Sequence, residues 1–279
     1  MIVSRFLRPS FLTLGLSLIA AGVFAQAQPA TKPFEPQVGQ EGKDVIWVPT
    51  PQSLVDKMLD IAKLTPKDYL IDLGSGDGRT VITAAKRGAR ALGIEYNPDM
   101  VEVSKRNAEK AGVAGKAGFV KADLFESDFS QATVITMFLL PSINLKLRPK
   151  ILDLKPGTRI VSNTFTMGEW EADETASVSD EKAGTWRTAL LWIVPAKVEG
   201  TWQSPQGELA LKQDFQMVSG TVKSGANTVP IANGKLRGDQ ISFNAGDAAY
   251  SGRVTGNEIK GTIKSGNNSS AWSASRAAH

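Results

Sequence analysis

Short apolar runs alternate with amphipathic segments along residues 44–196. The apolar runs have the length of buried strands, and the segments between them repeat their apolar positions every three or four residues, as helices do. Such alternation predicts a parallel sheet whose strands are joined by right-handed helical crossovers. The expected strands are 69–73, 89–96, 115–125, 132–141 and 184–195, and the expected helices are 51–62, 80–87 and 97–112. A hydrophilic stretch, 169–182, is expected to hold an antiparallel partner of the last strand.

The pattern changes in residues 197–279, where short segments alternate polar and apolar positions and Gly, Ser and Asn are frequent. The sequence Gly-Thr-Val-Lys-Ser-Gly at 220–225 returns as Gly-Thr-Ile-Lys-Ser-Gly at 261–266. Repeated hairpins of this kind predict a small antiparallel all-β domain, either a meander or a barrel. Two interpretations stay open for it: a module that docks a substrate or an envelope or membrane component, and an appendage that adds solubility or stability.

Residues 1–27 have the three parts of a secretory signal peptide. Arg5 and Arg8 precede an apolar run at 11–25, and the segment ends in Ala-Gln-Ala. The run has 15 residues, whereas a spanning helix needs about 20. We therefore expect cleavage after Ala27, with cleavage after Ala25 as the alternative, and an exported protein, periplasmic or secreted. The alternative is a protein that keeps 11–25 as a membrane anchor.

The amino-acid composition excludes several classes of functional site that need cysteine or histidine. The chain of 279 residues has no cysteine, and its single histidine is His279. Disulfide scaffolds, zinc fingers, thiol nucleophiles and Ser-His-Asp triads therefore lack a required residue, and no metal site is expected. The formal net charge is +4, but no run of basic residues with interleaved aromatics is present. Nucleic acid is thus not an expected partner.

A glycine-rich turn follows the first strand, in the sequence Asp72-Leu-Gly-Ser-Gly-Asp-Gly-Arg79. Glycines at this place let a ligand approach the backbone closely at the start of a helix. A dinucleotide fingerprint is written G-x-G-x-x-G, and here Arg79 stands where its last glycine belongs. The sequence therefore argues against a nicotinamide cofactor at this turn.

Three acidic residues, Asp72, Glu95 and Asp123, are expected at the ends of successive strands. The carboxyl ends of parallel strands meet at one edge of the sheet, and a carboxylate beside an apolar strand is costly without a partner. Three acids there fit an adenosine ligand that carries a positive sulfonium and an amino group. The alternative is a doubly wound fold in which tight glycine turns and solvated acids have no ligand.

The combined pattern, D-x-G-x-G-x-G followed by G-I-E and A-D, resembles the class I S-adenosylmethionine-dependent methyltransferases. The resemblance implies an α/β, Rossmann-like fold with a doubly wound, mostly parallel seven-stranded sheet, and S-adenosyl-L-methionine as methyl donor. In that family the first acid and the glycines hold the methionine end, the second acid the ribose and the third the adenine amino group. By position, the implied cofactor-binding residues are Asp72, Gly74, Gly76, Gly78, Glu95 and Asp123.

A narrower resemblance rests on Val-Pro-Thr-Pro at 48–51, Ala-Asp-Leu-Phe at 122–125, Phe-Leu-Leu-Pro at 138–141 and Leu-Arg-Pro at 147–149. Over residues 45–195 the chain resembles the ATP synthase c-subunit lysine N-methyltransferase family and its bacterial relatives. This implies a transferase that N-methylates a protein lysine, which enters between the segment before the first strand and the loop after the fourth. Candidates for the acceptor channel are Thr50, Phe138, Pro141 and Asn163.

The sequence thus predicts four parts: a signal peptide at 1–27, a linker at 28–43, a methyltransferase domain at 44–196 and a small β domain at 197–279. No residue stands out as a general base, so positioning and desolvation of the acceptor amine are the expected means of catalysis. A function of a different class stays open: an exported binding module that uses a methyltransferase fold without catalysis.

Overall fold

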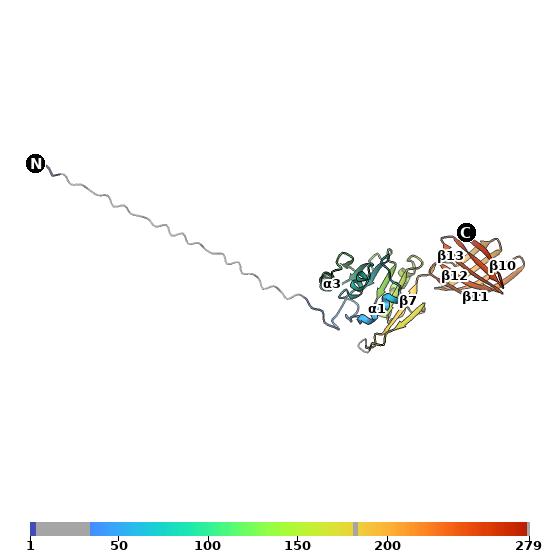
Figure 1. Cartoon of the computed structure of the whole chain (residues 1–279), viewed down its shortest axis with the longest axis horizontal. Coiled ribbons are helices and arrows are strands. Elements are labelled where there is room, and N and C mark those ends of the chain that lie inside the picture. Colours follow the sequence, from blue (N-terminus) through green and yellow to red (C-terminus); the bar gives the residue numbers. More distant parts are fainter. Residues whose placement is uncertain (4–33, 181–183, 278–279) are drawn as a thin grey trace. The chain divides into compact units, whose positions relative to one another are not determined.

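The structure is a computed structural model that describes residues 1–3, 34–180 and 184–277. Residues 34–279 form one compact unit, which contains the sheet and the C-terminal strands (Figure 1). The predicted signal peptide lies, from residue 4 onward, outside the described residues, and so does the predicted linker up to residue 33. In the described part of the chain no helix is long and apolar enough to cross a membrane.

A seven-stranded sheet forms the centre of the first domain, as predicted. Six strands run in the same direction, and one, which lies next to an edge strand, is antiparallel to both of its neighbours. The strand order reverses direction between β1 (Tyr69–Leu73) and β4 (Val134–Met137), the place where open α/β sheets bind their ligands. In spatial order the strands are β3 (Ala117–Lys121), β2 (Arg90–Glu95), β1 (Tyr69–Leu73), β4 (Val134–Met137), β5 (Arg159–Asn163), β7 (Thr188–Ile193) and β6 (Glu174–Ser177).

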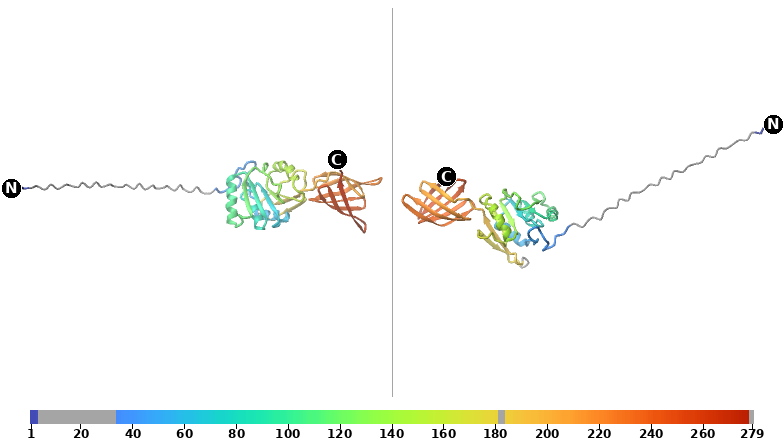
Figure 2. Two further views of the ribbon diagram at one scale, coloured as in Figure 1. Left: turned by 90° about the horizontal axis from the view of Figure 1, so that it is seen from above. Right: turned by 180° about the vertical axis from the view of Figure 1, so that it is seen from behind.

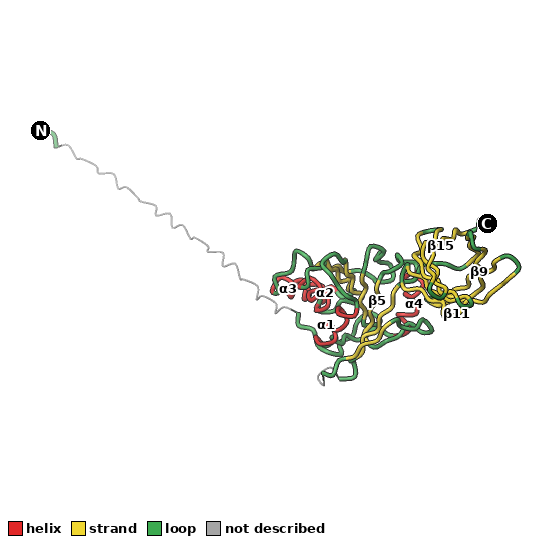
Figure 3. The backbone as a smooth tube through the Cα atoms, turned by 45° about the vertical axis from the view of Figure 1, so that its right-hand side comes forward, coloured by secondary structure: helices red, strands yellow, loops and turns green. Residues whose placement is uncertain are grey.

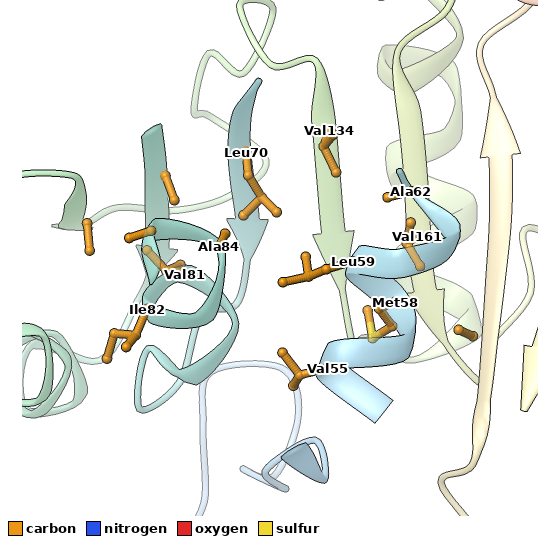
Figure 4. Close-up of a cluster of buried hydrophobic side chains, with 14 of the residues drawn as sticks. Val55, Met58, Leu59, Ala62, Leu70, Val81, Ile82, Ala84, Val134 and Val161 are labelled. Atoms are coloured by element: carbon orange, nitrogen blue, oxygen red, sulfur yellow. The ribbon is translucent and has the colours of Figure 1, made fainter. Parts of the chain in front are cut away.

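Three helices bury apolar faces against one side of this sheet: α1 (Gln52–Ile61), α2 (Arg79–Lys86) and α3 (Pro98–Lys110). Figure 4 shows side chains of α1 directed toward the strands that carry Leu70, Val134 and Val161. The start of α3 follows from its sequence, because the Asn97 Oδ1 accepts a hydrogen bond from the Asp99 N–H (2.9 Å) and Pro98 suits the first helical position.

Helix α4 (Pro141–Leu152) belongs to the opposite side of the sheet, in a second core cluster that also contains Trp192. No helix was expected for these residues. Pro149 lies inside the segment, and a proline removes one helical N–H donor. Burial of Ile143, Leu147 and Ile151, spaced four residues apart, outweighs that cost.

The C-terminal strands close into an antiparallel barrel of eight strands (Figures 2 and 3), which confirms the predicted all-β domain. Buried Trp202, Phe243 and Trp272 belong to its apolar core. The barrel closes where β15 pairs with β8. The strands are β8 (Gly200–Ser204), β9 (Gly207–Asp214), β10 (Met217–Ser224), β11 (Asn227–Arg237), β12 (Gln240–Ala245), β13 (Ala248–Thr255), β14 (Glu258–Ser265) and β15 (Asn268–Arg276).

Candidate functional site

A cavity of about 490 Å³ opens at the carboxyl ends of the central strands. Its walls come from the glycine turn after β1, from the residues that follow β2, β3 and β4, and from the segment 40–50 that precedes α1. Phe165 and Trp186 complete it. The cavity therefore lies at the reversal of strand order, where this type of sheet places its ligand site.

The glycine turn exposes bare backbone to the cavity at Gly74 and Gly76, which both have left-handed φ angles (79° and 54°). A Cβ atom on Gly76 would lie 2.5 Å from the Nε1 of Trp47, which is too close for two unbonded atoms. Glycine is thus required at position 76 both by its backbone angle and by the indole that packs on it.

Gly78, the third glycine predicted to bind the cofactor, does not line the cavity. It is the N-cap of α2, with a φ of 81°. The space that its side chain would fill is occupied by the ring of Phe119, 2.7 Å from the Cβ position, and by the Cβ of Ser104, 2.9 Å from it. Its lack of a side chain lets α2 begin close to β3 and α3.

Asp72, on β1, is buried at the floor of the cavity. The Thr136 hydroxyl donates a 2.7 Å hydrogen bond to its Oδ1. Burial raises the pKa of Asp72 from its ordinary value of 3.8 to about 7, the Thr136 bond opposes this rise, and the negative charges of Glu95 and Asp77 add to it. A cationic ligand group placed beside this carboxyl would favour its ionised form.

Glu95, at the end of β2, also lines the cavity. Its Oε2 accepts the Gly76 N–H (2.9 Å) and its Oε1 accepts the Asn97 N–H (2.9 Å). These bonds fix the carboxylate between two loops. Each oxygen keeps a lone pair that can accept a further hydrogen bond from a ligand hydroxyl.

Asp123, after β3, lines the same cavity and is paired with Lys43 at 2.5 Å. Hydrogen bonds from the Lys43 ammonium and from the Phe125 N–H hold the pKa of Asp123 below its ordinary value, and the pKa of Lys43 is raised by the same pairing. The Lys43 Nζ also lies 4.7 Å from the centre of the Tyr96 ring, within cation–π range.

Lys43 belongs to a segment whose role the sequence analysis missed. Residues 40–43 were assigned to a linker, but they line the cavity. A turn holds them there: Glu41 and Ile46 form a β-bridge, and the Trp47 N–H donates to the Gln40 carbonyl (2.9 Å). The Trp47 indole on the glycine turn then fixes the segment over the cavity. The Pro, Gln and Gly content suggested a linker, and only the paired backbone shows the turn.

Of the predicted acceptor-channel residues, Thr50 and Phe138 line the cavity, and Asn163 and Pro141 do not. Asn163 is buried behind Thr50, and its Nδ2 donates to the Thr50 Oγ1 (3.2 Å). Pro141 is the first residue of α4. Two aromatic residues that the sequence analysis did not select, Phe165 and Trp186, lie against Phe138 and line the cavity with it.

The described residues contain no group of three or more His, Cys, Asp or Glu side chains that could hold a metal ion. The cavity combines a carboxylate end, with Asp72, Glu95 and Asp123, and an aromatic end, with Phe138, Phe165 and Trp186. The carboxylate end can bind a cationic, hydroxylated ligand, and the aromatic end can hold an apolar or weakly hydrated cationic group.

Comparison with known proteins agrees with this site. The model of the ANTKMT methyltransferase domain matches residues 72–174. A protein-lysine N-methyltransferase from the archaeon Saccharolobus islandicus is 48% identical over 153 residues, which cover 54% of this chain and 94% of that protein. The mouse ATP synthase c-subunit lysine N-methyltransferase is 41% identical over 107 residues, and the match spans 38% of this chain and 43% of that relative.

A solved structure extends the comparison to the fold. The RNA methyltransferase of Salinibacter ruber, in complex with S-adenosyl-L-homocysteine, is 47% identical and superposes with a TM-score of 0.51. The match covers 54% of this chain and 96% of that one. Because the archaeal relative is matched over nearly its whole length and that structure holds the demethylated cofactor, the chain belongs to the S-adenosylmethionine-dependent methyltransferases of the protein-lysine N-methyltransferase family.

Proposed function

We propose that this protein transfers a methyl group from S-adenosyl-L-methionine to the side-chain amine of a lysine in a protein substrate. The observation that carries the proposal is a single cavity with carboxylates and bare backbone at one end and aromatic rings at the other. The names of the archaeal and animal relatives support lysine as the acceptor.

The residues at the carboxylate end fit the methyl donor. Asp72 is a buried carboxyl that accepts a hydrogen bond from the Thr136 hydroxyl, so it can also accept a cation. The Ser75 hydroxyl, in the glycine turn that follows, is buried without a hydrogen bond. We assign Asp72 and the Gly74–Gly76 backbone to the methionine end, Glu95 to the ribose and Asp123 to the adenine amino group. When bound, the donor supplies an electrophilic methyl group on a positively charged sulfur.

The aliphatic residues beside the aromatic rings would prepare the acceptor. A lysine amine reacts only as the neutral base, and the residues around Phe138 that line the cavity, Leu139, Leu140 and Ile143, carry no ionisable group. An amine that enters this apolar region loses hydration, which lowers its pKa and favours the neutral form. The protein would therefore act by positioning and desolvating the amine, and the displaced proton would leave to water.

The proposal is tested by labelled transfer. The purified protein and S-adenosylmethionine with a labelled methyl group are incubated with protein and RNA fractions of the source cell, and labelled protein is hydrolysed to amino acids. We expect label in methylated lysine, and its loss in the Asp72→Asn variant. Label in RNA would support the acceptor named for the Salinibacter structure instead. Cofactor binding without transfer to either fraction would support the binding module.

The cellular place and the partner of the barrel are further parts of this proposal. The pattern of residues 1–27 supports an exported or periplasmic enzyme, with an anchored form through 11–25 as the alternative. The match to the archaeal relative takes in 94% of that protein and only 54% of this chain. The relative therefore has a methyltransferase domain without a part equivalent to the barrel. We propose that the barrel docks an envelope component. Sequencing of the mature N-terminus and cell fractionation test the first point, and co-purification with and without residues 197–279 tests the second.

A further inference from the structure

Three aromatic rings from separate parts of the chain meet at one end of the cavity. Phe138 follows β4, Phe165 follows β5, and Trp186 precedes β7. Their ring centres are 5.9 Å apart for Phe138 and Phe165, 5.2 Å for Phe138 and Trp186, and 5.5 Å for Phe165 and Trp186. The planes of the Trp186 and Phe138 rings make an angle of 65°, so these rings do not form one parallel stack.

These rings differ from the aromatic residues of the core. Trp170 and Trp192 are fully buried, whereas the three rings at the cavity are each half-buried and line it. None of the three belongs to the apolar clusters of the core on either side of the sheet. Rings that stabilise a fold by burial are normally covered, so the partial exposure of this group into a shared cavity indicates a binding surface.

The backbone beside Phe165 is held in an unusual conformation. Thr164 has a φ of 62°, which is rare for a β-branched residue because its side chain crowds the preceding carbonyl. The Phe165 N–H donates to the Asn163 carbonyl at 2.7 Å, which closes a tight turn, and the Thr164 hydroxyl donates to the Asn163 Oδ1. Strain of this kind persists where the surroundings fix it, often at binding sites. Here it sets the direction of the Phe165 ring.

The triangle of ring centres has the size to contact one small cation. With sides of 5.9, 5.2 and 5.5 Å, the point equidistant from the three centres lies about 3.2 Å from each. A charge up to about 5 Å above the plane of the centres is then still within about 6 Å of all three, the range of the cation–π interaction. Phe138 and Phe165 are nearly parallel (20°), and the plane of Trp186 is steep to both (65° and 55°), so one ammonium group at this distance can meet the face of Trp186 and the face of one phenylalanine.

We propose that Phe138, Phe165 and Trp186 form a methylammonium subsite, which binds the cationic head group of a lysine that already carries methyl groups. Methyl groups weaken the hydration of an ammonium and add apolar surface, so a methylated cation gains more from these rings and loses less on leaving water. The inference rests on the proposed function, because it takes lysine as the acceptor, and it assigns Phe165 and Trp186 to substrate recognition.

Binding of two matched probes tests the subsite. One probe is Nα-acetyl-Nε-trimethyllysine methylamide, and the other is its neutral analogue with carbon in place of the quaternary nitrogen. Their affinities for the full chain, saturated with S-adenosylhomocysteine, are compared by titration calorimetry. We expect the charged probe to bind about tenfold more tightly, and the Trp186→Ala variant to lose this preference. Trp186→Phe should keep part of it, and the control Leu145→Ala, at an exposed residue of α4 that does not line the cavity, should keep it fully.

Equal affinity for the two probes, undetectable binding of the charged probe, or a preference that survives in Trp186→Ala would each overturn the subsite. Unchanged binding of S-adenosylhomocysteine shows that a variant is folded, and Phe165→Leu provides the same test if Trp186→Ala does not fold. The result is separate from the test of the proposed function. Transfer to protein lysine without a charge preference removes the subsite alone, and a charge preference without transfer removes the enzymatic proposal alone.

Discussion

Asp72 provides the most quantitative prediction, because its ionisation controls whether the floor of the cavity attracts a cation. Its pKa of about 7 in the structure without ligand means that the carboxyl is about 3% ionised at pH 5.5 and about 50% ionised at pH 7.0. The proposed role at the methionine end requires the ionised form. The apparent dissociation constant is the intrinsic constant divided by the competent fraction. The affinity for S-adenosylmethionine should therefore rise about sixteenfold between these two pH values.

Titration calorimetry over this pH range measures the effect. The α-amino group of the ligand, with an ordinary pKa of about 7.7–8.0, stays mostly protonated below pH 7. The matched control is Asp72→Asn, which keeps the acceptor for the Thr136 hydroxyl but cannot ionise. We expect this variant to bind weakly with little dependence on pH. An affinity of the unchanged protein that is flat from pH 5.5 to 7.0, or an Asp72→Asn variant that keeps the full dependence, would refute the reasoning.

The same carboxyl makes a prediction for stability, with the opposite consequence. Because the pKa of Asp72 is higher in the folded chain than its ordinary value of 3.8, protonated Asp72 favours folding at low pH, and this contribution is lost as the pH rises toward about 7. The difference between the two pKa values corresponds to roughly 4 kcal/mol of the free energy of unfolding. Without ligand at pH 8, Asp72→Asn should therefore raise the Tm, by on the order of 10 °C. A lower Tm for the variant at pH 8 would contradict this assignment.

Two further predictions follow from other walls of the site. Lys43→Gln removes the ammonium group that the adenine amino group would have to displace from Asp123. S-adenosylhomocysteine should therefore bind up to about fivefold more tightly, as measured by calorimetry at low salt. Weaker binding would show that Lys43 instead assists the ligand. Gly78→Ala places a methyl group within 2.7 Å of the Phe119 ring at a left-handed φ, so the free energy of unfolding should fall by about 2 kcal/mol or more in urea denaturation. The control Gly115→Ala, which meets no atom within 4 Å, should change it by less than about 0.5 kcal/mol. Equal effects of the two changes would refute the packing role of Gly78.

Much of the fold could be predicted because its signals are local. The apolar run at 69–73 and the glycine turn after it specify a strand and the start of a helix within about ten residues of chain. Asn97 and Pro98 likewise fix the start of α3, through a cap that forms between neighbours. The alternating positions after residue 197 predicted antiparallel strands. Closure of the barrel could not be predicted in this way, because β15 pairs with β8 through Ser275 and Gln203, which lie far apart in the chain.

Some residues of the functional site could likewise be predicted from local sequence, and others could not. The sequence by itself determined that Asp72, Glu95 and Asp123 stand at strand ends, because the length of each apolar run sets that place. All three line one cavity. The tertiary structure alone decided that Gly78 packs against Phe119 and that Lys43 reaches Asp123. It also decided that rings at 138, 165 and 186 come together. Local patterns act over one or two turns of chain, whereas these contacts depend on the order of the strands and on which loops pack over their ends.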